Sequence, residues 1–114
     1  INKLKIIITK MQNKIKTKNI VTTISENGIL YTKENKIQHS PAFKINLLDP
    51  SGAGDVIITI ISLLMKIKFD IDTTMKIANK CGSIVCTKLG VYVITKSNFS
   101  QVIEKYSLNK NYSL

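Results

Sequence analysis

The first fifteen residues carry apolar side chains at steps of three and four positions. These positions are Ile1, Leu4, Ile8, Met11 and Ile15. That spacing predicts an amphipathic helix whose other face is rich in Lys. Asn19 follows a Lys-rich last turn and predicts where this helix ends.

Two short β-branched runs follow the helix. Residues 20–24 are β-branched throughout and predict a buried strand, and residues 29–32 predict a second strand that returns beside it. Asn27-Gly28, between them, is the dipeptide typical of a tight hairpin. Glu34-Asn35 then turns the chain again.

The rest of the chain alternates extended and helical patterns. The predicted elements are an extended segment over residues 36–48 interrupted at Pro41, a helix over 56–67, a helix from Asp72 or Thr73 to about Lys88, a strand over 91–95 and a helix from Ser97. The helix over 56–67 is apolar nearly all round, which predicts a central, buried position. Residues 109–114 predict a frayed end. Helices alternating with β-branched strands indicate an α/β fold with a sheet layer.

Composition adds little to this picture. The 114 residues hold 17 basic side chains, all Lys, against 7 acidic ones, for a net charge of +10. Ile, Lys and Asn number 20, 17 and 10, and all three are favoured by A/T-rich codons. The lysines near the start lie between the apolar stripe positions, without aromatic neighbours, so no nucleic-acid partner is predicted.

Other classes of protein are disfavoured by single features. The longest apolar stretch, Val56 to Met65, is half the length of a membrane span, so no membrane partner is predicted. Cys81 and Cys86 stand five apart with no nearby His, which predicts free thiols in a reducing cytoplasm rather than a disulfide or metal pair. The chain begins at Ile1 rather than Met, which predicts that it is a portion of a longer protein.

The segment Gly52-Ala53-Gly54-Asp55 carries the candidate chemistry. Small residues at the start of a helix let backbone N–H groups converge, and with the positive end of the helix dipole they make an anion site. Asp55 in the first turn could take a proton from a hydroxyl that attacks a bound phosphate. The alternative interpretation is an ordinary helix start, because Asp favours the first turn and Gly favours turns.

Beyond this segment, the chain resembles the ribokinase-like (PfkB) sugar kinases. Asp49-Pro50-Ser51-Gly-Ala-Gly-Asp55 is similar to the signature that opens a long buried helix in that family. The Thr23-x-Ser25-Glu26-x-Gly28 strand-turn, Ala78-Asn79 and Lys88-Leu89-Gly90 resemble the heptose 7-phosphate kinase domain of ADP-heptose synthesis. The resemblance covers residues 1–106. It implies the carboxy-terminal, nucleotide-binding part of a three-layer α/β/α sandwich, with residues 107–114 as a frayed tail.

The resemblance implies roles for particular residues. Asp55 would be the catalytic base, and the N–H groups of Gly52, Ala53 and Gly54 would form the anion hole for the transferred phosphoryl group. The residues implied to bind nucleotide are Thr23, Ser25, Gly28 and Asn79. Asp49 is implied to help hold a monovalent cation such as K⁺, and ATP with Mg²⁺ is the implied phosphoryl donor.

Several residues also have plainer interpretations. Asn79 could be an exposed helix residue, and Glu26 could hold Mg²⁺ through water or lie in an exposed turn. His39 is predicted to be a solvated loop residue. Ser51 keeps the hydroxyl of the family's usual Thr, and Pro50 is tolerated because it needs no donor.

The implied activity is ATP-dependent phosphorylation of D-glycero-D-manno-heptose 7-phosphate at O1, a step toward ADP-heptose and the lipopolysaccharide core. The alternatives are another sugar or nucleoside kinase of the family, or a nucleotide-binding remnant without catalysis. The family's sugar-binding residues and β lid belong to an amino-terminal half that these residues do not match. The implied macromolecular partners are therefore that missing half or a second copy.

Overall fold

The computed structural model describes residues 1–107. Its elements in chain order are α1 (Asn2–Ile15), β1 (Val21–Thr23), a 3₁₀ turn η1 (Ser25–Asn27), β2 (Ile29–Lys33), β3 (Lys36–Ser40), α2 (Ala53–Lys66), α3 (Ile71–Cys86) and α4 (Lys96–Ser107). Residues 108–114 of the predicted frayed tail lie outside the described residues, and Ser107 is the last residue of α4.

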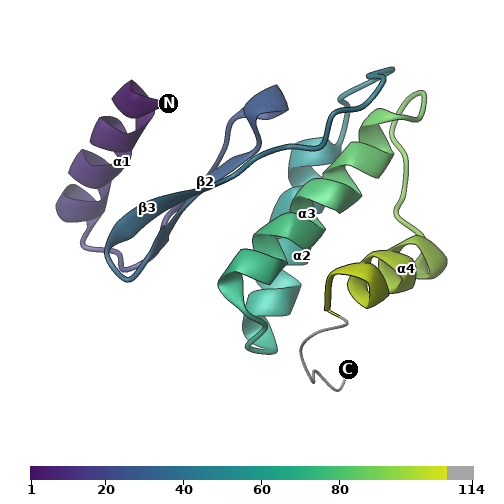
Figure 1. Cartoon of the computed structure of the whole chain (residues 1–114). Coiled ribbons are helices and arrows are strands. Elements are labelled where there is room, and N and C mark those ends of the chain that lie inside the picture. Colours follow the sequence, from purple (N-terminus) through teal and green to yellow (C-terminus); the bar gives the residue numbers. More distant parts are fainter. Residues whose placement is uncertain (108–114) are drawn as a thin grey trace.

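The elements form three layers, with a small sheet as the middle layer. The three strands pair antiparallel in the order β1-β2-β3. Figure 1 shows α1 on one side of the sheet and α2 and α3 on the other, with α4 against the helices. The central strand β2 has buried side chains from Ile29 to Thr32 because both of its faces are covered. The predicted sheet layer between helices is therefore present.

The tight hairpin turn is not where Asn27-Gly28 predicted it. The chain makes the 3₁₀ turn η1 there, and the Gly28 N–H donates to the Ser25 carbonyl at 3.0 Å. The two-residue turn is Glu34-Asn35, where both residues have positive φ (49° and 62°) and Lys33 pairs with Lys36. Positive φ at both central residues is the geometry of the type I′ hairpin turn.

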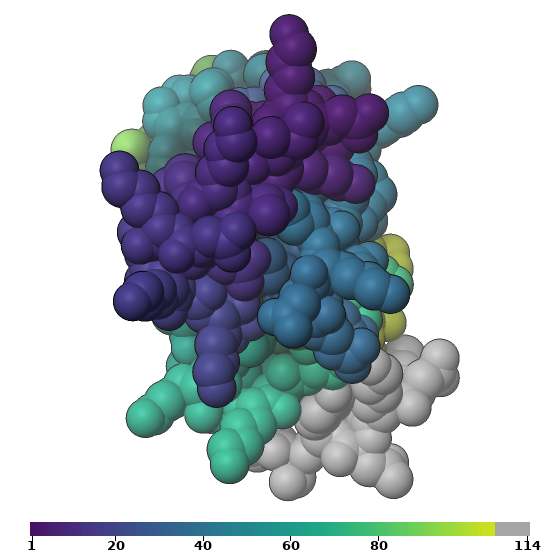
Figure 2. Space-filling view, turned by 90° about the vertical axis from the view of Figure 1, so that its left-hand side faces the viewer, coloured from purple at the N-terminus to yellow at the C-terminus, as the bar shows by residue number. Residues whose placement is uncertain are grey.

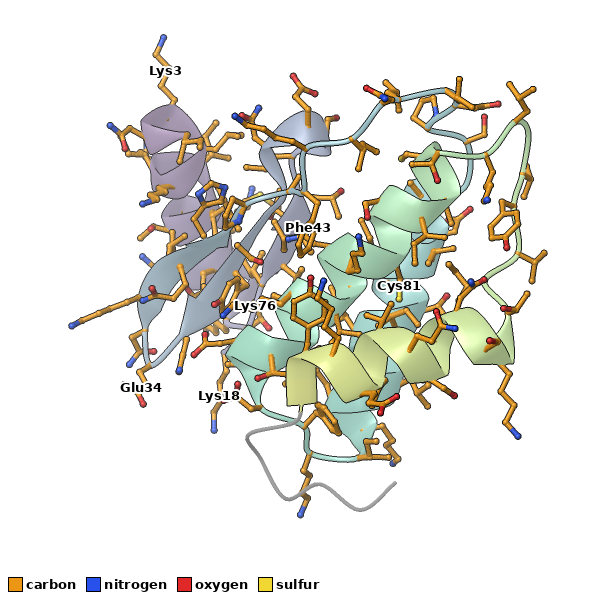
Figure 3. All side chains as sticks on the ribbon, turned by 45° about the vertical axis from the view of Figure 1, so that its right-hand side comes forward. Lys3, Lys18, Glu34, Phe43, Lys76 and Cys81 are labelled. Atoms are coloured by element: carbon orange, nitrogen blue, oxygen red, sulfur yellow. The ribbon has the colours of Figure 1, made fainter. Side chains whose placement is uncertain are left out.

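Helix α2 buries one face rather than all of them, so the prediction of full burial is wrong. Ile60, Ile61 and Leu64 are buried against the core, whereas Ile58 is 61% exposed. The buried face packs on α3, where Gly82 permits close approach: a Cβ there would come within 2.9 Å of the Ile57 side chain. Figure 3 places Cys81 of α3 among the packed helices.

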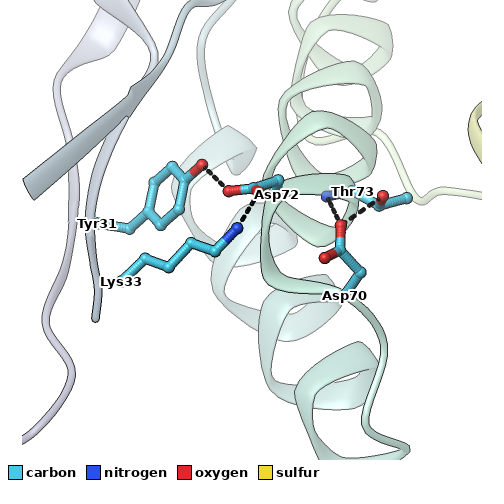
Figure 4. A network of polar contacts seen from close by, with 5 residues as sticks. All are labelled: Tyr31, Lys33, Asp70, Asp72 and Thr73. Carbon is cyan, nitrogen blue, oxygen red and sulfur yellow. Dashed lines mark hydrogen bonds and ion pairs between the residues drawn. The ribbon is translucent and has the colours of Figure 1, made fainter. Parts of the chain in front are cut away.

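Helix α3 begins at Ile71 and is capped by Asp70, not by Asp72 or Thr73 as predicted. The Asp70 carboxylate accepts from the Thr73 N–H (2.9 Å) and hydroxyl (2.7 Å). Asp72 instead accepts hydrogen bonds from Tyr31 (2.5 Å) and from the Lys33 ammonium, both on β2 (Figure 4). This network joins the sheet to the first turn of α3.

Helix α1 has the predicted period but little burial. It ends at Ile15, where Lys16 turns into the left-handed region, four residues before the predicted stop. Ile8 is its buried residue, whereas Ile1, Met11 and Ile15 are about half exposed. Figure 2 shows this helix lying across the near face of the molecule with long side chains projecting outward.

Two smaller predictions also fail. Residues 91–95 form no strand, because no described strand lies beside them, and Val91 and Val93 are exposed. His39 is exposed, as predicted, but it lies on β3 rather than in a loop, and its Nε2 donates to the Asn27 carbonyl at 2.6 Å.

None of the helices within residues 1–107 is long and apolar enough to cross a membrane.

Candidate active site

The loop before α2 is held by Asp49. One carboxylate oxygen accepts from the Ser51 N–H (2.9 Å), and the other accepts from the Gly90 N–H (3.0 Å) across the fold. Hydrogen bonding from Ser51, through its hydroxyl and then its N–H, lowers the pKa of Asp49 below its usual value. The N–H groups of Leu48 and Asp49 both donate to the Cys86 carbonyl at the end of α3 (2.9 and 3.2 Å). The loop is thus fixed to α3 and to the segment that follows it.

The start of α2 presents backbone donors. Gly52 caps the helix with φ of 80°, a left-handed conformation that suits glycine. Within residues 1–107 the N–H groups of Gly52 and Gly54 find no acceptor, whereas the Ala53 N–H donates to the Pro50 carbonyl at 3.2 Å. Two of the three predicted anion-hole donors are therefore free, and the third is engaged in a turn.

Gly54 leaves open space where a side chain would stand. A Cβ at this position would meet nothing within 4 Å, so no atom of residues 1–107 requires a glycine there. The residue also lies in a helix, where glycine is costly compared with alanine. A small residue that the fold does not need, beside free donors at a helix start, fits the close approach of an anionic ligand.

Asp55 lies in the first turn of α2 and is exposed. Its carboxylate accepts no hydrogen bond from the described residues, although its carbonyl accepts from the Thr59 hydroxyl at 2.8 Å. A carboxylate that is not used in capping or pairing remains free to act on a ligand. Gly52, not Asp55, fills the cap position, and Asp55 in the first turn is also what an ordinary helix start would have, so both interpretations of this residue stay open.

A cleft of about 770 Å³ runs beside the start of α2. Its lining includes most of the predicted nucleotide-binding and anion-hole residues, namely Thr23, Ser25, Gly28, Ala53, Gly54 and Asn79. Asp49, Gly52 and Asp55 do not line it. Residues from β1, the η1 turn, α2 and α3 thus meet around one cavity.

Gly28 and Asn79 also have structural roles that were not predicted from the sequence. Gly28 has φ of 95°, and a Cβ on it would lie 2.2 Å from the Ser40 carbonyl oxygen, so the turn requires glycine. Asn79 is buried rather than exposed, and its amide donates to the carbonyl and hydroxyl of Ser40 (3.0 and 2.9 Å). It therefore ties the end of β3 to α3 and shapes the cleft wall.

Phe43 and Cys86 line the cleft and were missed. Phe43 follows β3 and is fixed by an edge contact with Tyr106 of α4 (5.8 Å between centroids) and by the Lys80 ammonium 5.1 Å from its ring centre. Figure 3 shows it lying over α3. The irregular segment after Pro41 carries no periodic pattern that would have shown which of its side chains enter a cavity.

The two thiols differ in environment. Both cysteines are free. Burial raises the pKa of the Cys81 thiol to about 11, and burial followed by the nearby Asp49 charge raises that of Cys86. Neither thiol is activated as a nucleophile, because a reactive thiol needs a lowered pKa.

The cleft also suits Mg²⁺ carried by a nucleotide. Mg²⁺ in phosphoryl-transfer sites usually keeps water and substrate phosphates as ligands, with one or two protein carboxylates. Glu26 is the carboxylate on the cleft wall, in the η1 turn. Among residues 1–107, no three His, Cys, Asp or Glu side chains form a metal cluster.

Comparisons with known proteins identify relatives of this chain. The chain is 33% identical over 98 residues to the bifunctional protein HldE of Campylobacter curvus, covering 85% of this chain and 20% of that protein. It is 33% identical over 95 residues to the deoxyribokinase of Salmonella typhi, covering 81% of this chain and 30% of that enzyme. The chain thus spans a third or less of the length of these relatives.

The fold matches part of the ribokinase fold. The crystal structure of the Thermotoga maritima ribokinase superposes with a TM-score of 0.74 at 18% identity, covering 84% of this chain and 33% of that one. Residues 1–97 match the pfkB family of carbohydrate kinases. The chain therefore belongs to the pfkB carbohydrate kinase family.

Proposed function

We propose that this chain forms the nucleotide-binding part of an ATP-dependent sugar kinase. The observation that carries the proposal is the meeting of the cleft with the start of α2, where Gly52 and Gly54 offer free N–H groups and Asp55 an unpaired carboxylate. A nucleotide would lie in the cleft with its phosphates toward α2. Family membership supports this assignment.

The chemistry follows from these groups. The sugar oxygen bonds to the γ-phosphorus, the bond from that phosphorus to the β–γ bridging oxygen breaks, and ADP leaves. Asp55 takes the proton of the attacking hydroxyl, while the N–H groups at the start of α2 stabilise charge on the transferred group. Mg²⁺, when bound, would neutralise phosphate charge, with Glu26 on the cleft wall as the candidate protein ligand. Positioning supplies most of the rate enhancement.

The acceptor we propose is D-glycero-D-manno-heptose 7-phosphate, phosphorylated at O1 to the 1,7-bisphosphate on the route to ADP-heptose. The likeness of the Thr23-to-Gly28 and Ala78-to-Gly90 segments to heptose kinases supports this choice, as does the relative from Campylobacter curvus. Equal identity to a deoxyribokinase supports the alternative of another sugar as acceptor.

A monovalent cation such as K⁺ remains part of the proposal, with Asp49 as the residue concerned. Both of its oxygens accept N–H groups that shape the loop before α2. A cation here would act on that loop and not on the nucleotide directly. Binding of ATP that strengthens when K⁺ replaces a large organic cation would support this role.

Calorimetry with ATP and ADP, with and without Mg²⁺, tests nucleotide binding directly. We expect the wild-type chain to bind nucleotide and Gly54→Val to abolish this binding, because a branched side chain would take up space at the wall of the cleft that Gly54 lines. Gln101→Ala, an exposed change on α4, is the matched control. A folded chain that binds neither nucleotide would refute the proposal.

The role of Asp55 requires the complete catalytic unit. There, we expect Asp55→Asn to lower kcat by about 10²- to 10⁴-fold, the usual size of a general-base contribution, with ATP affinity nearly unchanged. Equal losses of kcat and ATP affinity would instead assign Asp55 a structural role.

A second candidate is nucleotide binding without transfer. It is favoured by the exposure of Asp55, opposite which the described residues build no wall for a sugar. ATP binding without phosphorylation of any sugar in the complete unit would support this alternative.

A further inference from the structure

The η1 turn forms part of the cleft wall, and its backbone needs support. Ser25, Glu26 and Gly28 all line the cavity. Ser25 has a φ of 51° and Gly28 a φ of 95°, so this short turn holds a non-glycine residue in the left-handed region. Such a conformation persists where the surrounding structure fixes it. The contacts that fix this turn therefore decide where its cleft-lining groups lie.

The side-chain hydrogen bond that reaches this turn comes from β3. Among the described residues, the Nε2 of His39 donates to the Asn27 carbonyl at 2.6 Å. The main-chain bonds of the turn are local: the Asn27 N–H donates to the Ile24 carbonyl, and the Gly28 N–H donates to the Ser25 carbonyl, both at 3.0 Å. These bonds close the turn on itself, whereas the imidazole joins it to a neighbouring strand.

His39 lies outside the cleft. Ile29 and Tyr31 of β2 belong to the core that the helices cover, so Leu30 between them lies on the opposite face of the sheet. His39 pairs with Leu30 across the two strands and shares that face. It is exposed and does not line the cavity. Its effect on a ligand in the cleft must therefore pass through the turn.

The next residue of β3 holds a different wall of the cleft. Ser40 is buried, and its carbonyl and hydroxyl accept from the Asn79 amide at 3.0 and 2.9 Å. Asn79 lines the cleft from α3. Successive side chains of a strand point to opposite faces, so His39 and Ser40 bond to different elements. The end of β3 thus fixes the η1 turn relative to α3.

We propose that His39 is a positioning residue for nucleotide: by holding the Asn27 carbonyl, it keeps Ser25 and Glu26 at the cleft wall for a nucleoside triphosphate and its Mg²⁺. The inference rests on the proposed function and adds a residue that touches neither ligand. Without the imidazole bond, binding would have to order the turn as well as fill the cleft. Ordering a loop on binding lowers affinity.

The test compares two amide side chains at this position by calorimetry with ATP and Mg²⁺. Gln carries its amide N–H groups at about the distance from the backbone at which His carries Nε2, whereas Asn is one methylene shorter. We expect His39→Gln to bind like the wild type and His39→Asn to bind about three- to tenfold more weakly, the usual size of one neutral hydrogen bond. Lys36→Asn, an exposed change at the other end of β3, is the matched control and should leave the affinity unchanged.

Hydrogen exchange on the same variants separates positioning from a general loss of stability. In His39→Asn the Asn27 and Gly28 amides should exchange faster, while the amides of α3 keep their wild-type protection. Wild-type affinity in His39→Asn, equal losses in His39→Asn and His39→Gln, or faster exchange throughout the chain would each overturn this role alone. A wild-type chain that binds no ATP would overturn the proposed function together with it.

Discussion

Gly54 occupies a helical position where the fold has room for a larger side chain. A Cβ there meets nothing within 4 Å, whereas Cβ atoms at Gly28 and Gly82 would collide with the backbone near Ser40 and with Ile57. The three glycines therefore have different reasons to be glycine. At Gly28 and Gly82 the reason lies in the folded chain, and at Gly54 it lies in the ligand that we propose.

This difference predicts opposite effects of alanine at two positions. Gly54→Ala should raise the free energy of unfolding by up to about 1 kcal/mol, through helix propensity, and weaken ATP binding. Gly82→Ala should lower the free energy of unfolding by about 1 to 3 kcal/mol, through overpacking against Ile57. Urea unfolding and ATP calorimetry on both variants check this. Destabilisation by Gly54→Ala would contradict it.

At the level of elements, much of the fold was predictable from the sequence. All four helices and the antiparallel strands follow from apolar period and β-branched runs, because local pattern decides helix and strand. The burial of each element was harder to predict. Helix α2 was predicted to be buried on all sides and is not, because burial depends on which elements lie beside a helix. The prediction of a strand over 91–95 was wrong for the same reason.

The candidate site was predictable in part. The four residues of the Gly52-to-Asp55 motif are contiguous in sequence, so their chemistry could be predicted locally. Asn79 required the family resemblance, because 25 positions separate it from Gly54. Phe43 and Cys86 enter the cleft through tertiary packing alone, which no local pattern encodes.

The contact between β2 and α3 carries a pH-dependent prediction. Hydrogen bonds from Lys33 and then Tyr31 hold the pKa of Asp72 below its usual value. A lowered carboxyl pKa gives stability that is present above the unfolded pKa of about 4 and is lost as pH falls through the folded value. Asp72→Asn should therefore cost up to about 1 kcal/mol at pH 7, a modest loss because the pair is partly exposed.

The measurement is urea unfolding of both proteins between pH 7 and pH 3. The difference between wild type and Asp72→Asn should shrink below about pH 4. A constant difference across this range would show that the charge of Asp72 is not what the network uses.

For the whole molecule, stability is unevenly distributed. Ile8 is the buried residue of α1, whereas α3 has ten buried residues and joins the sheet to α2 and α4. Local opening follows such differences in burial. We expect α1 amides to exchange with solvent well before those of α3, with native-state hydrogen exchange as the measurement. Equal protection in the two helices would contradict this expectation.

The two thiols give the protein an internal reporter. Cys81 is sealed in the core, while Cys86 is partly accessible on the cleft wall. An alkylating reagent at mildly alkaline pH should therefore label Cys86 and leave Cys81 unmodified. Occupancy of the cavity can then be followed by chemical footprinting of the natural sequence, without introducing a probe that would disturb the surfaces around it.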